Sequence, residues 1–191
     1  MLDEKRMNRV LEKLDTDQML ITDPFAIYYL TGRWIFAGER FLGLLIKKGK
    51  KPILYLNELF RFDEDLGVTK KMITDTDSVA ELLKYDVDPN EALGVDKTLA
   101  ARFLLPMIDD AVASKFINGS LAVDHTRAIK DEEEIALMRE SSHINDLAMA
   151  EFKKLPKSGI TEIEVANQML DIYKKLGAEA YSFSPIVAFG V

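Results

Sequence analysis

Short apolar runs alternate with helical patterns through residues 6–124, and this alternation limits the fold more than any other feature of the sequence. Predicted strands cover residues 19–21, 41–46, 52–56, 68–73, 93–96 and 116–124. Predicted helices cover residues 6–14, 24–32, 57–65, 78–84 and 99–113. Because alternating strands and helices pack in layers, we predict an α/β sandwich.

The pattern changes after residue 124, where long helical segments replace the alternation. The sequence there predicts helices over residues 131–155 and 161–177 and a strand over residues 182–189. Each helix starts with a capping box, formed by Asp131 with Glu134 and by Thr161 with Glu164. We therefore place a domain boundary near residues 125–130, with one domain over 1–127 and another over 128–191.

The balance of charge argues against nucleic acid as a partner. The chain has 25 Lys and Arg against 32 Asp and Glu, a net charge of −7, whereas binding to phosphates needs a basic face. The one compact basic run, residues 47–51, lies between two predicted strands. We interpret this run as the solvated tip of a β-hairpin.

The residue content also excludes several kinds of site. The sequence has no cysteine, which rules out disulfides, thiolate zinc sites and cysteine nucleophiles. The longest dense apolar run, residues 41–46, is too short to cross a bilayer. Residues 1–6 are charged and lack the apolar core of a signal peptide. We expect a cytoplasmic protein that does not use a membrane.

The two histidines and the acidic run at residues 131–134 do not form a recognisable metal motif. His125 and His143 are too far apart for a compact helical motif such as H-E-x-x-H. A pair of Asp124 with His125 could bind metal, but we favour a polar strand end, and for His143 a half-exposed helix position. The acidic run is better explained as the first turn of a helix, where negative charge is stabilised.

The segment from Gly32 to Arg40 is the best candidate for contact with a ligand or partner. It follows a helix that Asp23 and Pro24 can begin and Gly32 can end, and it should therefore be an exposed loop. The loop contains Trp34, Phe36, Arg33, Glu39 and Arg40. Large aromatics and arginines on a loop favour ligand or partner contact. The alternative is that Trp34 and Phe36 fold the loop back onto the protein core.

Several segments, taken together and in order, resemble the creatinase/prolidase-type metallopeptidases, the pita-bread enzymes with an added N-terminal domain. The matching segments are Asp23-Pro24 with residues 27–32, Gly38-Glu39-Arg40, residues 127–131 with Glu134-Ile135 and Met138-Arg139, residues 159–166, and residues 182–190. The resemblance covers nearly all of the chain. It implies a mixed-sheet N-terminal domain, followed by two helices and one strand that begin a pita-bread catalytic domain.

The resemblance also implies a chemistry that this chain does not carry alone. Such enzymes cleave Xaa-Pro peptides with two divalent metal ions, often manganese, which activate a water molecule and stabilise the oxyanion. The family's ligands are two Asp, one His and two Glu, and all of them follow the strand that ends here at Gly190. We therefore expect a fragment that holds no metal, has no catalytic residue and is inactive alone.

The resemblance also implies a role for the loop of residues 32–40, which precedes the second predicted strand. In relatives, the N-terminal domain of one subunit lies near the active site of its dimer partner. The resemblance therefore implies a homodimer in which Trp34, Glu39 and Arg40 gate the site for proline-containing peptides. Other readings are a creatinase-like amidinohydrolase or a non-peptidase family member, since fold does not fix function, or a stand-alone binding module.

Overall fold

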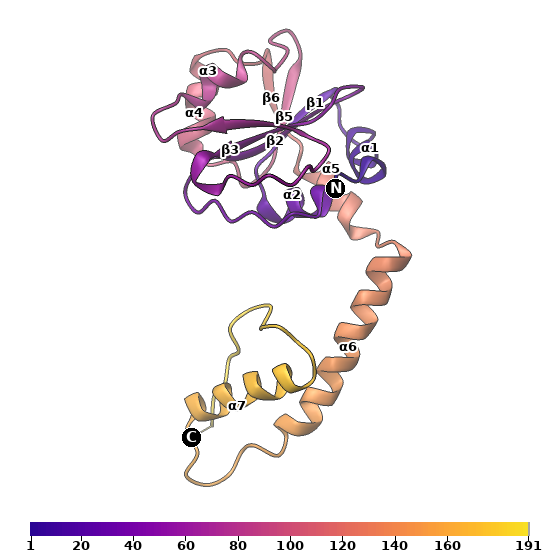
Figure 1. Cartoon of the computed structure of the whole chain (residues 1–191), viewed down its shortest axis with the longest axis vertical. Coiled ribbons are helices and arrows are strands. Elements are labelled where there is room, and N and C mark those ends of the chain that lie inside the picture. The colour runs from indigo at the N-terminus through magenta and orange to yellow at the C-terminus, as the bar shows by residue number, and fades with distance from the viewer. Residues whose placement is uncertain (191) are drawn as a thin grey trace. The chain divides into compact units, whose positions relative to one another are not determined.

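A computed structural model describes residues 1–190, and the chain divides into two compact units, Met1–Ile129 and Lys130–Val191. The first unit contains a six-stranded sheet in the order β4-β3-β2-β1-β5-β6 (Figure 1). The strands are β1 Gln18–Ile21, β2 Leu42–Lys47, β3 Ile53–Asn57, β4 Thr69–Ile73, β5 Ala92–Val95 and β6 Lys115–Asn118. The pairs β1–β2 and β2–β3 are antiparallel and the other three are parallel. The predicted α/β fold with a mixed sheet is confirmed.

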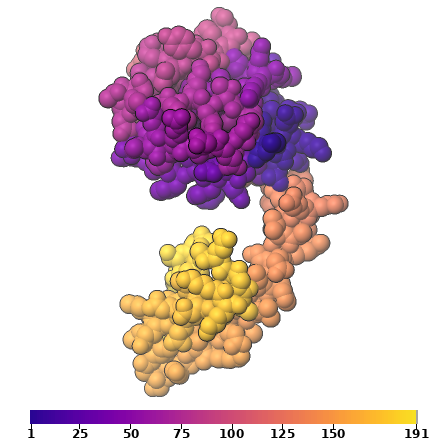
Figure 2. Space-filling view, viewed as in Figure 1, coloured from indigo at the N-terminus to yellow at the C-terminus, as the bar shows by residue number. Residues whose placement is uncertain are grey.

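Helices cover both faces of this sheet (Figure 1). One face packs against α1 Glu4–Leu11, α2 Pro24–Thr31 and α5 Ser120–Ala128, and the other against α3 Val79–Leu83 and α4 Ala101–Asp109. Successive side chains of β1 point to opposite faces of the sheet, as a strand's two-residue period requires. Met19 and Ile21 pack in the core beneath α1, α2 and α5, and Leu20 packs in the core beneath α3 and α4. In the space-filling view this unit is a closely packed body (Figure 2).

The local signals at α2 and at the first hairpin act as expected. The Asp23 side chain accepts from the Phe25 N–H at 3.0 Å, and Gly32 ends α2 in the left-handed region at φ +71°. Strands β2 and β3 form the predicted hairpin, and the Lys50 N–H donates to the Lys47 carbonyl at 3.1 Å across its lysine-rich tip. These elements position the loop between α2 and β2.

The strand predicted over residues 116–124 is confirmed only for its first part, up to the Asn118-Gly119 pair where the sequence allows a bend; the rest is a helix. Strand β6 ends at Asn118, whose side chain accepts from both the N–H and the hydroxyl of Ser120, at 3.0 and 2.6 Å. This turn starts α5, in which Ala122, Val123 and Thr126 are buried with helical spacing. The apolar run therefore belongs to a helix face, and His125 is an exposed residue of that helix and not of a strand end.

Two predicted helices are shorter than the sequence indicates. Within residues 57–65 the structure has only a 3-10 turn, Glu58–Phe60, begun by the Asn57 side chain. Helix α4 begins at Ala101 and ends at Asp109, inside the predicted range of 99–113. Ala111 takes a positive φ of 48°, which lies outside the right-handed helical region, so the helix ends before it.

The second unit holds the two capped helices, α6 Glu132–Phe152 and α7 Glu162–Lys175. Both capping boxes are formed. The rings of Phe152 and Tyr173 pack edge to face at a centroid distance of 5.1 Å. The strand predicted for residues 182–189 is wrong, because a strand needs a neighbour and the described part of this unit offers none. Among residues 1–190, no helix combines the length and apolar character that crossing a membrane requires.

Candidate functional site

The loop between α2 and β2 is both anchored in the core and exposed to solvent. Ile35 and Ala37 are buried, whereas Trp34 and Phe36 are 46% and 72% exposed. The loop is therefore folded back by its small aliphatic residues and not by its aromatic ones. The sequence left open whether the loop is exposed for ligand contact or folded back onto the core. Its aromatic side chains are exposed, and its aliphatic side chains are buried in the core.

Trp34 packs against two other exposed aromatic side chains. Its ring centroid lies 4.9 Å from that of Phe25 and 6.2 Å from that of Tyr28, both on α2. The rings are tilted or edge-on to each other, the arrangement that aromatic pairs prefer. The result is a surface patch of Phe25, Tyr28 and Trp34 whose members support one another while remaining accessible.

Arg40 is paired with the carboxylate of Asp75, which lies just after β4. Its Nε and Nη2 atoms donate to Asp75 Oδ1 and Oδ2 at 2.9 and 3.0 Å, and Asn57 Nδ2 also donates to Asp75 Oδ1 at 2.8 Å. Such a two-pronged contact fixes orientation as well as distance. Hydrogen bonds from Arg40 hold the pKa of Asp75 below its ordinary value, and the same contact raises the pKa of Arg40.

Glu39, in contrast, extends into solvent. Its side chain is 82% exposed, and Arg102 Nη1 of α4 lies 4.0 Å from Glu39 Oε2. The turn that presents Glu39 uses Gly38 in the left-handed region at φ +60°, and the Arg40 N–H donates to the Ala37 carbonyl at 3.1 Å. The Glu39 carboxylate is therefore accessible to solvent, whereas two donor atoms of Arg40 are paired with Asp75.

Two adjoining cavities flank this turn. One, of about 380 Å³, lies between the loop and the start of α4, and the other, of about 320 Å³, lies toward the carboxylates that follow β4. Both are lined by Glu39, Arg40, Phe41, Arg102 and Phe103. The sequence identified the first two of these residues, but it gave no indication that α4 would supply Arg102 and Phe103.

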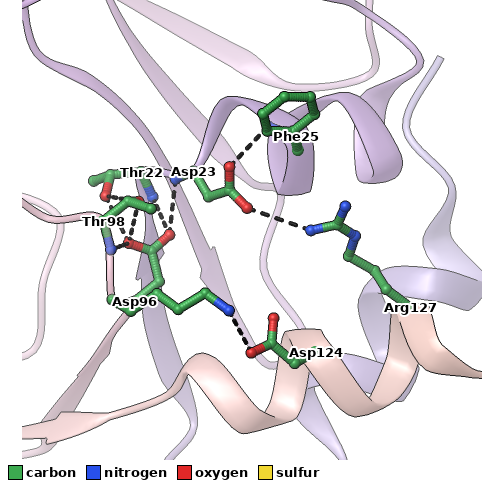
Figure 3. Close-up of polar contacts among 8 residues, drawn as sticks. Thr22, Asp23, Phe25, Asp96, Thr98, Asp124 and Arg127 are labelled. Atoms are coloured by element: carbon green, nitrogen blue, oxygen red, sulfur yellow. Dashed lines mark hydrogen bonds and ion pairs between the residues drawn. The ribbon is translucent and has the colours of Figure 1, made fainter. Parts of the chain in front are cut away.

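A network of polar contacts supports the base of α2 beside these cavities (Figure 3). Asp96, at the end of β5 and 7% exposed, accepts from the N–H groups of Thr22 and Asp23 at 2.6 and 2.8 Å. It also accepts from the Thr22 hydroxyl at 2.6 Å and from the hydroxyl and N–H of Thr98 at 2.8 and 3.2 Å. This buried carboxylate joins the ends of two neighbouring strands, a role that no local sequence pattern indicates.

The network continues to α5 through two ion pairs (Figure 3). Arg127 Nη1 lies 3.3 Å from Asp23 Oδ2, and Lys97 Nζ lies 2.6 Å from Asp124 Oδ2. Asp124, which the sequence paired with His125 as a weak metal candidate, is therefore engaged by a lysine.

The described residues do not fit the metal pair of the resembling enzymes. Within residues 1–190, no group of three or more His, Asp or Glu side chains is arranged to hold a metal ion. His143 is exposed on α6 and makes no such group. Among the described residues, the loop and the cavities beside it are the candidate site.

The sheet order, the loop and the capped helix pair define a two-part chain whose parts match two family models. The model for the Creatinase/Prolidase N-terminal domain matches residues 5–129, and that for Metallopeptidase family M24 matches residues 136–191. The chain belongs to the creatinase/prolidase N-terminal domain family, and it continues into an M24 segment. The resemblance inferred from the sequence motifs is confirmed.

Two curated relatives match nearly the whole length of this chain. An uncharacterized peptidase of Staphylococcus aureus strain USA300 is 26% identical over 189 residues, which cover 97% of this chain and 54% of the relative. An uncharacterized peptidase of Staphylococcus epidermidis is 26% identical over 187 residues, or 97% and 53% of the two chains. The chain thus spans about half the length of the curated relatives it matches.

Solved structures share the fold. A prolidase from Thermococcus sibiricus superposes with a TM-score of 0.79 at 22% identity, over 97% of this chain and 54% of that one. The dipeptidase PepE from Mycobacterium ulcerans gives 0.79 at 22% identity, over 94% and 51%. An Xaa-Pro dipeptidase from Bacillus anthracis gives 0.74 at 24% identity, over 94% and 51%. At these identities the likeness establishes the fold.

Proposed function

We propose that this chain is the N-terminal portion of a metal-dependent Xaa-Pro peptidase, a dipeptidase or aminopeptidase that acts on proline-containing peptides in the cytoplasm as a homodimer. The observation that carries the proposal is the succession of the two family matches in one chain, residues 5–129 and 136–191. Two divalent ions, which we propose to be manganese, would supply the activated water. Residues 1–190 offer no group of side chains arranged to hold them, so in this proposal the ligands belong to other parts of the longer enzyme.

In this proposal the loop of residues 33–40 gates the active site of the partner subunit. Exposed aromatic rings at Trp34 and Phe36 offer an apolar cover for a proline ring and exclude water. The exposed carboxylate of Glu39 is available for a substrate ammonium group. Trp34 is braced by Phe25 and Tyr28, whereas Phe36 and Glu39 are the more exposed side chains, at 72% and 82%.

Arg40 acts in this proposal as a positioning residue. Two of its donor atoms are paired with Asp75, so the guanidinium holds the turn that presents Glu39. A substrate carboxylate would have to compete with that contact. Arg40 therefore contributes to gating through the geometry of the loop.

The test is steady-state kinetics of the longer enzyme that contains this chain, with Xaa-Pro dipeptides as substrates. Arg40→Ala and Trp34→Ala should each lower kcat/KM, by about 1 to 3 kcal/mol of transition-state stabilisation. If Arg40 positions the loop, Asp75→Asn should reproduce most of its loss. Arg61→Ala, which removes an exposed arginine outside both cavities, is the matched control. Unchanged kinetics for Arg40→Ala and Trp34→Ala at full dimer content would refute the gating role.

A further inference from the structure

The cavity between the loop and α4 combines an apolar wall with Arg102, for which residues 1–190 supply no carboxylate closer than 4.0 Å. Phe36, Phe41 and Phe103 line it together with Arg102. The rings of Phe41 and Phe103 pack edge to face at 5.1 Å, which makes that wall a fixed surface. Cavities that take small molecules are mostly apolar, with a few polar groups that orient the ligand.

The two arginines of this cavity differ in availability. Arg40 is held at both prongs by Asp75. The guanidinium of Arg102 lies 4.7 Å above the Phe103 ring, and its nearest carboxylate, Glu39, is 4.0 Å away, the outer limit of an ion pair. The side chains of Arg102 and Glu39 are 53% and 82% exposed, so their mutual attraction is weak. The contact with the ring restrains Arg102 while leaving N–H groups at its edge free.

A ligand that carries both charges complements this pair. Its carboxylate would accept parallel hydrogen bonds from Arg102, and its ammonium group would lie against Glu39. An apolar side chain would pack on the phenylalanine wall. The volume of about 380 Å³ is near the lower end of the range for ligand cavities and suits a free amino acid or a dipeptide.

We propose that this cavity binds an apolar amino acid or dipeptide as a zwitterion, with Arg102 as the residue that recognises its carboxylate. The site shares Glu39 with the proposed gating loop, and the choice of a peptide-like ligand rests on the proposed function. Binding itself needs no partner subunit, no metal and no turnover. Its failure and the failure of the gating proposal can therefore be told apart.

The experiment is a titration of the 15N-labelled chain of 191 residues, followed through the amide resonances of Gly38, Glu39 and Arg102. The probes are L-proline and glycyl-L-proline, which are zwitterions, prolinamide, which lacks the carboxylate, and N-acetyl-L-proline, which lacks the ammonium group. We expect saturable shifts with the zwitterions, with a Kd on the order of 1 mM for so small a ligand. The zwitterion that binds more tightly identifies the size of ligand that the cavity takes.

Three variants separate recognition of the carboxylate from effects on folding. Arg102→Ala should weaken binding by about tenfold or more, the loss expected for a charge-assisted, two-pronged contact. Arg102→Lys keeps the charge and should retain part of the affinity. Arg61→Ala lies outside the cavity and should bind like the unaltered chain. The proposal is overturned if no zwitterion gives saturable shifts, if Arg102→Ala binds as well as the unaltered chain, or if prolinamide binds as tightly as L-proline.

Discussion

Replacing Asp96 should destabilise the first unit by an amount that depends on which atoms take the place of its carboxylate. Oδ2 accepts the N–H groups of Thr22 and Asp23, and Oδ1 accepts the two threonine hydroxyls and the Thr98 N–H (Figure 3). The hydroxyls can turn, and the exposed Thr98 can bond to water. The two backbone donors at the base of α2 cannot find other partners without movement of the chain.

Asp96→Ala leaves those two donors unsatisfied. An unsatisfied buried donor costs about 1 to 3 kcal/mol, so the loss of both contacts should lower the free energy of unfolding by about 2 to 6 kcal/mol. Asp96→Asn can keep its amide oxygen where Oδ2 lies and direct its NH2 group to the threonine hydroxyls. Its loss should be smaller, about 1 to 2 kcal/mol, because the acceptor becomes neutral.

The assay is urea unfolding of the chain followed by tryptophan fluorescence. Trp34 is the only tryptophan and lies in the first unit, so the transition reports that unit alone. Asp124→Asn, which removes only the exposed pair with Lys97, is the matched control and should cost at most about 1 kcal/mol. The reasoning fails if Asp96→Ala costs no more than this control, or if Asp96→Asn is as damaging as Asp96→Ala.

Three other outcomes are expected. The chain of 191 residues should not hydrolyse Xaa-Pro peptides in the presence of manganese, cobalt or zinc; metal-dependent turnover that persists through repurification would contradict this. The second unit exposes large apolar side chains, including Ile163 and Ile186. We therefore expect concentration-dependent self-association in sedimentation velocity, which replacing both residues by Glu should reduce; a monomer at every concentration would contradict it. The lowered pKa of Asp75 means that its contact with Arg40 is fully present above about pH 4 and is lost as the pH falls through that lowered pKa. NMR of the Arg40 Nε–H group should show this titration, and Asp75→Asn should lack it.

The parts of the fold that were predicted correctly are those with local causes. Asp23 and Gly32 bracket α2, and capping boxes start α6 and α7, because each of these contacts spans only a few residues. The order of strands in the sheet has no such local cause. The parallel pairing of β1 with β5 joins residues more than seventy positions apart, and no pattern within either strand specifies its neighbour.

The mistaken strands have a common origin. A short apolar run is compatible with a strand or with the buried face of a helix, and the sequence around Leu121, Ala122 and Val123 does not distinguish them. The turn at Asn118 decides in favour of a helix there. Residues 182–189 have a strand-like composition, but a strand also requires a partner, which composition does not supply.

For the site, composition identified the loop but not its contacts. Trp34, Glu39 and Arg40 were unusual for a loop, and two of these three side chains are strongly exposed. Asp75 lies 35 residues from Arg40 in the sequence, and Arg102 comes from a different helix. Only the folded chain brings these charges together and shows which arginine is occupied.

The placement of α5 has a consequence for how the protein is made. This helix is the last element of the first unit, yet its Ala122 and Val123 belong to the same core as α1, and Thr126 Oγ1 accepts from Lys13 Nζ at 3.0 Å. A nascent chain cannot close this core until residues near 129 have left the ribosome. It can then fold as a unit while the remainder is still being synthesised. Pausing of translation before α5 would leave uncovered the part of α1 that packs on α5, and that interval is when the nascent chain would most need a chaperone.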